Sequence, residues 1–592
     1  MKNNEINGGV KMKKFAKKFL VLSVVSGLAA SALVGCSQDQ PQTDSNTSQA
    51  AGEQGSGEAT QTESKYKTVV VASLEMNGVF SPFFATTAPD NDIVEMVHGA
   101  LIKSDRNAQP QADLAEYKIE QVEAEDGSVS ETIYTFTLKD GVTFSDGTPV
   151  TADDIIFSYN VLADPAYDGP STFSTLPIVG MEEYNKGDAT EISGIEKVDD
   201  KTVKVTLKGV DPSAIWKLGA IAVAPKAYYG VDDSGKEYVK GDVSVPKSRN
   251  DAPMGAGPYK FASFENNVVT LNANENYYGG APSTPTIKYQ VTAETNKLEG
   301  LKLEEFDISD PSSSPDMVAD VESAGFEYEL IDNLGYGYIG INAERVPDKN
   351  VRKGLMHLMN RRPAIETYYG DLATVIERPM STVSWAYPQD ATEYYGFDPA
   401  KALEYFKAAG YEQVEKNGKL SLEKDGQQLR VEVGIPGGGN MEHPTAPVLT
   451  QMKTEMEKMG AVLEISDTDG TVFFDRLETG DWDMWVAAWQ ATVDPDMYQT
   501  YHSQGPSNHY KVQNEELDNL IVEARQTNDI EERKDCYSKA LDIIMDEAVE
   551  MPVYQRKNMY VFNQNVVDME SLPEDMTPYY TYFAEVQTFR LK

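Results

Sequence analysis

Residues 136–159 read Phe136-Thr-Leu-Lys-Asp-Gly-Val-Thr-Phe-Ser-Asp-Gly-Thr-Pro-Val-Thr-Ala-Asp-Asp-Ile-Ile-Phe-Ser-Tyr159. Large apolar side chains occupy every second position along Thr132–Leu138, a pattern that predicts a half-buried strand. After a turn, Thr151 precedes a helical pattern as its N-cap, and Asp154 stands at the capping-box position. A strand that passes so directly into a capped helix indicates a fold of α/β layers.

The same alternation of strands and helices continues toward the C-terminus. Further strands are predicted at Thr202–Leu207, Leu429–Ile435, Val462–Ser466 and Asp483–Trp489, and helices are predicted to begin at Asp398, Pro444 and Val472. The first two of these helices end at glycine, Gly410 and Gly460, which tolerates the left-handed conformation of a helix C-cap. The strand–helix–strand run over residues 429–489 predicts one lobe with a sheet of its own.

The first 65 residues read as a targeting segment and a tether. Five lysines in residues 11–18 precede an apolar run, Phe19–Leu33, of a length typical of a secretory signal. Leu33-Val34-Gly35-Cys36 resembles a bacterial lipobox, in which Cys36 is diacylated and becomes the N-terminus; an ordinary signal peptide with a chance cysteine is the alternative. Met1 and Met12 are both possible starts. Residues 36–65 are polar, and we expect them to be a disordered tether.

The composition of the remaining body excludes several classes of function. The whole chain carries a net charge of -42, and removal of the first 35 residues, with six Lys and one Glu, leaves -47. Such an excess of negative charge argues against nucleic-acid binding and against a basic membrane-docking face. Only Cys36 and Cys536 occur, so the mature body is expected to form no internal disulfide.

Motifs of catalysis, metal binding and cofactor binding are incomplete. Gly335–Gly340 has the glycine spacing of a dinucleotide fingerprint, but Tyr338–Ile341 itself reads as a strand, so no helix N-terminus follows to hold a pyrophosphate. Asp467, Asp469 and Gly470 resemble part of an EF-hand loop that lacks its first and last ligands. The five histidines show no metal-ligand spacing. We therefore expect no catalytic residues, no metal and no cofactor.

Three of the five tryptophans crowd together at positions 482, 485 and 489, in and directly before one predicted strand. Trp485 and Trp489 share a face of this strand and Trp482 lies on the other, and Asp494-Pro495 follows as a stop. Aromatic walls suit ligands whose side chains vary, because stacking and the burial of apolar surface depend little on the chemical identity of those side chains. The alternative is that these indoles belong to the core.

Five motifs, in order along the chain, resemble one family. They are the opening stretch 136–159; Gly255–Tyr259 with Asn274–Tyr278; Tyr338–Asn342 with Asp348–Arg352; Asp398–Ala402 with Ala409–Tyr411; and Trp489–Tyr498 with His502-Ser503. They are similar to those of the extracellular solute-binding proteins of family 5, the oligopeptide- and dipeptide-binding receptors of ABC importers. The resemblance covers nearly all of the chain after the tether.

The resemblance implies a two-lobed α/β fold of the periplasmic-binding-protein type, in its type II, large-cluster form with an extra subdomain and a hinge between the lobes. We accordingly expect lobe I in residues 66–95, 245–292 and 556–592. The extra subdomain is expected in residues 96–244, and lobe II in residues 293–555. Residues 1–35 are the expected lipoprotein signal peptide, and residues 36–65 the tether.

The resemblance also implies where the ligand binds. In peptide-binding members, the strand that enters the Asp-Pro motif pairs with the ligand backbone, so Ala488 and Gln490 would offer main-chain groups and Trp489 would lie at the ligand. Thr492 stands where Gram-negative peptide receptors carry an Asp that neutralises the ligand's α-ammonium. Asp494 is the candidate to replace that Asp, although an Asp before Pro is more often a turn residue.

The expected function is that of a receptor and not of an enzyme. We expect a monomer, anchored through Cys36 at the outer face of a Gram-positive-like cell membrane, that captures an oligopeptide between its lobes and delivers it to the permease of an ABC transporter. An oligosaccharide, an opine or a metal chelate in place of the peptide remains the alternative, because the family serves these solutes too.

Overall fold

The computed structural model describes residues 64–125, 127–436, 438 and 443–592, all of which belong to the compact unit Glu63–Lys592. The predicted signal peptide, Cys36 and all but the last two residues of the predicted tether lie outside the described residues. Within the described ranges, every helix is too short or too polar to cross a lipid bilayer.

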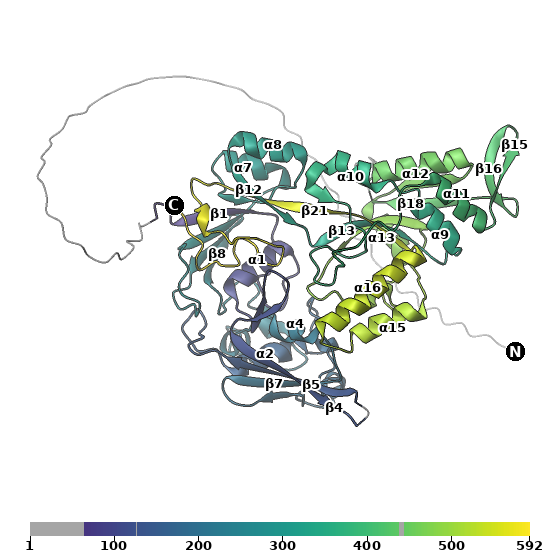
Figure 1. Ribbon diagram of the computed structural model, residues 1–592. Coiled ribbons are helices and arrows are strands. Elements are labelled where there is room, and N and C mark those ends of the chain that lie inside the picture. The colour runs from purple at the N-terminus through teal and green to yellow at the C-terminus, as the bar shows by residue number, and fades with distance from the viewer. Residues whose placement is uncertain (1–63, 126, 437, 439–442) are drawn as a thin grey trace, which may run out of the picture. The chain divides into compact units, whose positions relative to one another are not determined.

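Twelve strands of the described chain form one large sheet. Ten of them lie in the order β19 (Val462–Asp467), β18 (Arg430–Ile435), β20 (Met484–Gln490), β13 (Gly335–Ile341), β21 (Glu550–Phe562), β11 (Ile308–Ser309), β1 (Thr68–Ser73), β10 (Thr286–Val291), β9 (Val268–Ala273) and β8 (Tyr259–Glu265). The short strands β12 (Glu327–Asp332) and β14 (Ala373–Thr374) also pair with β21. The long strand β21 therefore joins two halves of the sheet (Figure 1).

The first half of the sheet contains β1, β8 to β12 and the C-terminal end of β21. β1 runs parallel to β10, and its inward-facing residues Val69 and Val71 are buried against Ile287 and Phe562. The helices α7 (Lys297–Lys302) and α8 (Pro315–Ala324) lie beside β12 at the top of Figure 1 and share a small core with Val561. The helix α1 (Ala88–Val97) contacts β8.

The strand pairing determines to which half of the sheet residues 293–332 belong, and the second lobe was expected to begin at residue 293. β11 pairs with β1 and β21, and β12 pairs with β21 over Lys557–Phe562, so residues 293–332 belong with the first half of the sheet. In the described chain the two halves are joined by Asn333-Leu334, between β12 and β13, and by the middle of β21. Periodicity along the chain could not reveal this division, because it depends on which strands pair.

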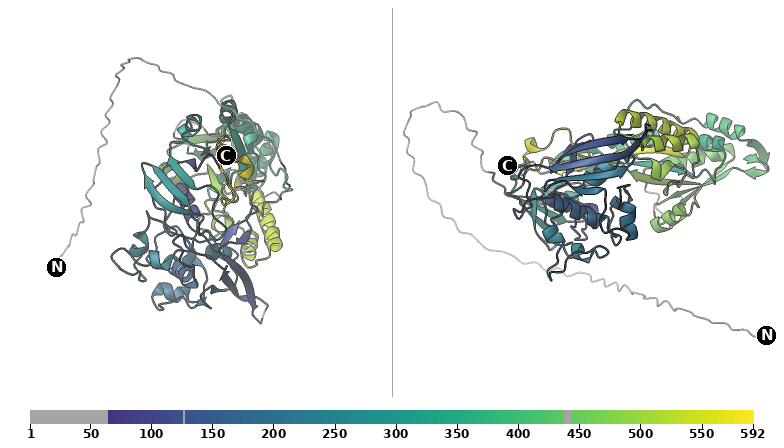
Figure 2. Two further views of the ribbon diagram at one scale, coloured as in Figure 1. Left: turned by 90° about the vertical axis from the view of Figure 1, so that its left-hand side faces the viewer. Right: turned by 90° about the horizontal axis from the view of Figure 1, so that it is seen from below.

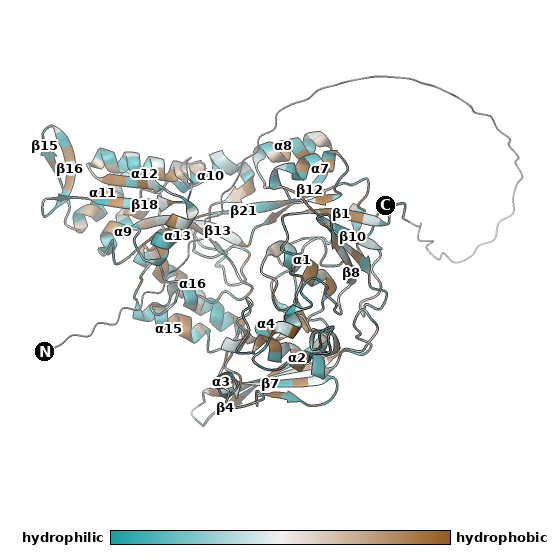
Figure 3. Cartoon of the chain, turned by 180° about the vertical axis from the view of Figure 1, so that it is seen from behind, coloured by the Kyte–Doolittle hydropathy of each residue, from teal (hydrophilic) through white to brown (hydrophobic). Residues whose placement is uncertain are grey.

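The second half of the sheet confirms the order of the predicted strand–helix–strand run, but the prediction of a separate sheet is wrong, because β21 joins these strands to the first half. β18, α12 (Ala446–Met459), β19, α13 (Gly470–Glu478) and β20 follow one another as expected, and β18 pairs in parallel with both β19 and β20. The helices α9 (Lys349–Met356), α10 (Arg361–Tyr369), α11 (Pro399–Ala408), α14 (Tyr498–Tyr501), α15 (Glu515–Ala524) and α16 (Ile530–Glu547) also belong to this part of the chain. The helices of this part of the chain have mixed hydropathy, as the teal and brown stretches on α12 and α15 show (Figure 3). Mixed hydropathy is typical of helices that bury one face.

The opening stretch of the sequence builds a smaller subdomain. β4 (Ala115–Glu123), β5 (Val129–Leu138), β7 (Thr202–Lys208) and β6 (Ile195–Lys197) form an antiparallel sheet, whose blue strands lie toward the viewer when the molecule is seen from below (Figure 2). The predicted capping box is present at the start of α2 (Ala152–Leu162): Thr151 N donates to Asp154 Oδ2 at 2.9 Å. The other oxygen of Asp154 accepts from Lys226 N at 2.8 Å and so fastens the neighbouring chain to this helix.

Shorter elements complete the described chain. They are the β2–β3 hairpin (Ile102–Ser104 and Pro110–Ala112), the β15–β16–β17 sheet (Glu412–Lys416, Lys419–Lys424 and Gln427–Gln428), and the helices α3 (Met181–Lys186), α4 (Ala214–Gly219), α5 (Lys226–Tyr229) and α6 (Ser244–Lys247). The β15–β16 hairpin extends away from the large sheet in Figure 1.

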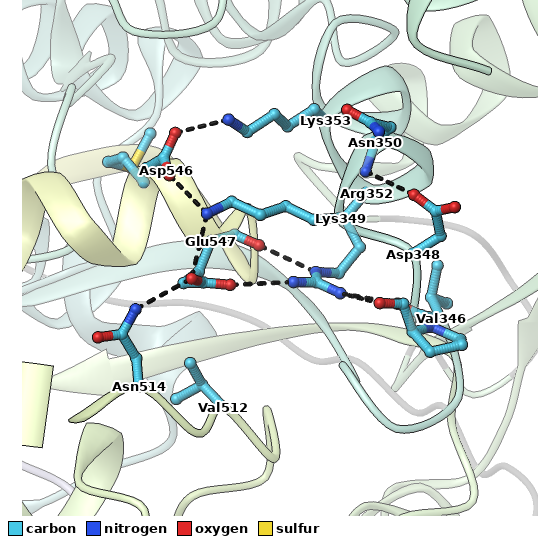
Figure 4. Close-up of polar contacts among 12 residues, drawn as sticks. Val346, Asp348, Lys349, Asn350, Arg352, Lys353, Val512, Asn514, Asp546 and Glu547 are labelled. Carbon is cyan, nitrogen blue, oxygen red and sulfur yellow. Dashed lines mark hydrogen bonds and ion pairs between the residues drawn. The ribbon is translucent and has the colours of Figure 1, made fainter. Parts of the chain in front are cut away.

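A buried arginine explains the motif Asp348–Arg352. Arg352, on α9, donates from Nε to the carbonyl oxygen of Glu547 at 2.9 Å and from Nη1 to that of Val346 at 3.0 Å, and Nη2 lies 3.2 Å from the Glu547 carboxylate (Figure 4). Lys349 and Lys353 both contact Asp546 at 2.5 Å. The motif thus ties α9 to the end of α16. Removal of Arg352 or of Glu547 would leave the other charge without its ion-pair partner and would lower the free energy of unfolding by about 3–5 kcal/mol.

Candidate functional site

The strand β20 presents main-chain groups on an open edge. β13 pairs with β20 from Gly335 opposite Gln490 to Ile341 opposite Met484. Asn342 N donates to Asp483 O at 2.9 Å, and Ala491 N donates to Leu334 O at 3.3 Å. Hydrogen-bonded pairs alternate along an antiparallel ladder, so Ala487 and Trp489 direct their N–H and C=O groups to β13, while Ala488 and Gln490 direct theirs to the opposite side.

The opposite side of β20 is only partly covered. Within the described ranges, β18 is the strand that pairs there, and it reaches only Met484 and Trp485. The side chains of Ala488 and Gln490 are exposed. In the part of the chain that the structure describes, no strand pairs with residues 486–490 on this side, which is the arrangement of an edge that can accept another strand.

The three crowded tryptophans fall into two groups. Trp482 and Trp485 are each 1% exposed and lie in the core. Trp482 Nε1 donates to Phe473 O at 3.0 Å, and Trp485 Nε1 donates to Tyr338 Oη at 3.2 Å. For these two indoles the alternative of a structural role is confirmed, and only Trp489 remains partly accessible.

Trp489 is held on one face and on its ring nitrogen. Its ring stacks on Tyr338 with the centroids 5.9 Å apart and the planes 2° from parallel. Nε1 donates to Tyr510 Oη at 3.0 Å. An indole supported in this way offers its remaining surface at low entropic cost to a ligand.

The glycine spacing in Gly335–Gly340 has a packing reason. As expected, Tyr338–Ile341 lies within a strand, β13, which already begins at Gly335. A Cβ on Gly340 would lie 2.3 Å from the Trp485 ring, and a Cβ on Gly337 would lie 2.5 Å from the Tyr554 ring. The glycines therefore make room for aromatic side chains from β20 and β21, which is why the spacing imitates a dinucleotide fingerprint.

A buried carboxylate lies behind Trp489 and was not predicted. Glu550 is 0% exposed and accepts hydrogen bonds from Tyr336 at 3.0 Å, from Tyr501 at 2.9 Å and from Tyr510. We call these four residues the Glu550 cage. Burial raises the pKa of Glu550 to about 7, although the three hydroxyl groups act to lower it. The one signal in the sequence is an isolated acid inside the apolar run Val549–Val553.

The two polar residues after β20 are engaged with their own surroundings. Thr492 is exposed, and its hydroxyl donates to Asp494 O at 2.5 Å. The Asp494 carboxylate pairs with Arg533 through two hydrogen bonds of 2.9 and 2.8 Å. Burial alone would lower the pKa of Arg533, but Asp494 outweighs it and the pKa is raised. Asp494 thus fastens this loop to α16, and its charge is already neutralised.

The structure also contains a cavity next to the first half of the sheet and the subdomain. A cavity of about 710 Å³ lies between α1, the subdomain and residues 578–587 near the C-terminus. Its polar lining includes His98, Lys103 and Asp113, and Asp113 accepts a hydrogen bond from Tyr278. Among the described residues, no group of three or more His, Cys, Asp or Glu is arranged to hold a metal ion.

Comparison with known proteins identifies the sequence family. The profile described as bacterial extracellular solute-binding proteins, family 5 Middle, matches residues 109–511. Oligopeptide-binding protein AppA of Bacillus subtilis is 25% identical over 584 residues, which cover 96% of this chain and 97% of the relative.

Comparison with solved structures identifies the fold. The ABC transporter substrate-binding protein CtaP of Listeria monocytogenes is 21% identical, with a TM-score of 0.71 over 88% of this chain and 99% of that one. AppA of Bacillus subtilis in complex with a nonapeptide is 22% identical, with a TM-score of 0.63 over 89% of this chain and 99% of that one. These likenesses confirm the predicted two-lobed, periplasmic-binding-protein-like α/β fold.

Proposed function

Because the chain belongs to the bacterial extracellular solute-binding proteins of family 5, we propose that it is the oligopeptide receptor of an ABC importer. In this proposal it captures an oligopeptide outside the cytoplasm and delivers it to the permease of the transporter. It acts as a monomeric receptor that returns its ligand chemically unchanged, and not as an enzyme.

The open edge of β20 is the observation that carries the proposal. An extended peptide laid along residues 486–490 would meet the main-chain groups of Ala488 and Gln490, and each hydrogen bond formed there would contribute roughly 0.5–1.5 kcal/mol. Such bonds use the peptide main chain and are therefore indifferent to its sequence. Trp489, held on one face by Tyr338, would add contact area to the bound peptide.

The surroundings of Thr492 and Asp494 support a site that does not require a free peptide N-terminus. The hydroxyl of Thr492 carries no charge with which to pair an α-ammonium, and Asp494 already pairs with Arg533. A ligand ammonium that recruited Asp494 would leave the buried Arg533 guanidinium without its ion-pair partner, which is costly. We therefore infer that acetylated and free peptides are bound alike.

Closure of the two lobes would take place where the halves of the sheet are joined. Asn333 Nδ2 donates to Asn558 Oδ1 at 2.8 Å, and Gln555 Nε2 donates to Asn333 O at 2.7 Å, so the two connecting segments are tied to each other. We place the hinge at these segments, and the lobe boundary near residue 334. A hinge of two short adjacent segments permits rotation with few broken contacts.

The location proposed for the receptor follows from its N-terminal sequence. Cys36 would carry two acyl chains, and two chains suffice for stable anchoring where one does not. Residues 37–65 would then form a tether that leaves the folded lobes free at the outer face of the membrane.

A competition between ligand classes tests the proposal. The purified protein is incubated with an equimolar set of synthetic peptides of two to twelve residues, a set of oligosaccharides, an opine and a nickel–histidine chelate, and the complexes are weighed by native mass spectrometry. We expect adducts with the masses of peptides. Adducts with a sugar, an opine or a chelate in the absence of any peptide adduct would overturn the peptide assignment and leave the receptor role in place.

A further inference from the structure

We propose that Glu550 is a positioning residue, which sets the orientation of Trp489 through the hydroxyl group of Tyr510. The residue lies on β21, the strand shared by both halves of the sheet, opposite Gly340 of β13. The statement about ligand affinity rests on the proposed function, whereas the statement about the geometry of Trp489 does not.

The relay consists of two hydrogen bonds with a fixed direction. Trp489 Nε1, which can only donate, donates to Tyr510 Oη at 3.0 Å, and Tyr510 donates its single hydroxyl proton to Glu550 Oε2. Because that proton is directed to the carboxylate, the lone pairs of the Tyr510 oxygen are free to accept from the indole. Glu550 therefore determines that Tyr510 acts as an acceptor toward Trp489.

The surroundings keep this relay in one arrangement. Tyr501 stacks on Tyr510 with the ring planes 13° apart, and Tyr336 and Tyr501 occupy further acceptor positions of the Glu550 carboxylate. All three tyrosines of the cage are buried. A buried polar network in which each member has hydrogen-bond partners is stiff, so Tyr510 is held with its hydroxyl group between Glu550 and Trp489.

The protonation state of Glu550 gives the relay a measurable signature. The groups that face the carboxylate are Tyr336, Tyr501 and Tyr510, with Tyr338 nearby; burial and the proximity of Glu550 raise the pKa of each phenol above its ordinary value. The phenols therefore stay protonated at neutral pH, and Glu550 is the member of the cage that titrates there. A protonated, neutral Glu550 is a weaker acceptor than the carboxylate, so protonation weakens the hydrogen bond from Tyr510 and loosens the hold of the Tyr510 oxygen on Trp489 Nε1.

The first experiment requires no ligand. The fluorescence of Trp489 is isolated as the difference between the protein and its Trp489→Phe variant, and is recorded from pH 5 to pH 8.5 in the native background and in the Glu550→Gln, Tyr510→Phe and Tyr501→Phe backgrounds. We expect a pH-dependent step in the native and Tyr501→Phe backgrounds, and none with Glu550→Gln or Tyr510→Phe. His502 and His509 lie in the same segment, so a His509→Gln variant serves as control and should retain the step.

The second experiment measures affinity for the peptide that gives the strongest adduct in the ligand competition. Glu550→Gln and Tyr510→Phe should each weaken binding about fivefold to tenfold, whereas Tyr501→Phe, which removes a hydrogen bond from the same carboxylate but leaves both bonds of the relay in place, should weaken it clearly less than either. In the Tyr510→Phe background, Glu550→Gln should add less than twofold. Tyr510→Phe keeps the ring and Glu550→Gln keeps the shape, and thermal melting of each variant confirms folding.

The outcomes separate this inference from the proposed function. If no peptide binds any variant but the fluorescence pattern holds, the peptide assignment fails and the positioning role stands. If Glu550→Gln leaves the Trp489 step unchanged, or weakens binding equally with and without Tyr510, then Glu550 does not act through Tyr510 and the inference is overturned.

Discussion

Replacement of Glu550 by Gln should change how the stability of the protein depends on pH. Glu550 is completely buried among three tyrosines, and burial raises its pKa from the ordinary 4.5 to about 7. A carboxyl group whose pKa is higher in the folded than in the unfolded state binds its proton more tightly when folded. Gln keeps the size and polarity of the protonated side chain but cannot ionise, so the variant lacks this pH dependence.

The sign and the size of this pH dependence follow from the raised pKa of Glu550. The stability that protonated Glu550 contributes is fully present below the unfolded pKa of 4.5, and is lost as the pH rises through about 7. One pKa unit corresponds to about 1.4 kcal/mol, so the free energy of unfolding of the native protein should fall by about 3 kcal/mol between pH 4.5 and pH 8, relative to the variant.

Urea unfolding followed by circular dichroism at pH 5, 6, 7 and 8 measures this difference. As the pH rises, the free energy of unfolding of the native protein should fall relative to that of the Glu550→Gln variant. Most of this change should occur between pH 5.5 and pH 7.5. Glu412→Gln, which removes an exposed carboxyl group, is the matched control and should give a curve parallel to that of the native protein. Parallel curves for Glu550→Gln would instead mean that Glu550 ionises in the folded protein as it does in the unfolded chain, and that its burial does not raise its pKa.

Three further predictions concern the ligand and the anchor. Trp489→Ala should weaken peptide binding by roughly 1–3 kcal/mol, as measured by calorimetry. It should lower the melting temperature less than Trp485→Ala does, since Trp489 is only partly buried whereas Trp485 is 1% exposed. A large fall in Tm with unchanged affinity would make Trp489 a core residue. An N-acetylated peptide and its free counterpart should bind within about threefold, or less than 1 kcal/mol, in a calorimetric titration, and a hundredfold preference for the free amine would mean that an acid such as Asp494 does recruit it. Cys36→Ala should move the protein from the membrane fraction to the medium, and retention on washed membranes would contradict an anchor at this residue.

Local patterns in the sequence predicted much of the fold. The strand Thr132–Leu138 lies within β5, and the Thr151–Asp154 capping box is formed at the start of α2. The run from β18 to β20 follows the predicted order. These features succeed because alternation, capping and glycine at C-caps depend on residues only a few positions apart.

The candidate site was predicted less completely, because its contacts join residues far apart in the sequence. Arg533 reaches Asp494 across 39 positions, and Tyr336 reaches Glu550 across 214. No local pattern distinguishes Asp494 as the partner of a buried guanidinium from Asp494 as a free acid. The division of the sheet near residue 334 likewise depends on the pairing of β11 and β12 with distant strands.

If a peptide is recognised through its main chain along the open edge of β20, an N-methyl scan of a bound peptide will show which of its amides are hydrogen-bonded. Each amide of the strongest-binding peptide is methylated in turn, and each side chain is separately replaced by alanine, with the affinity measured by calorimetry. N-methylation removes one hydrogen-bond donor and blocks close approach of the strand. We expect alternate N-methyl peptides to lose tenfold or more in affinity, in the period of two of a paired strand, while most alanine replacements change it less than threefold. Uniform tolerance of N-methylation, with affinity governed by one or two side chains, would show that the peptide is not held by its main chain along β20.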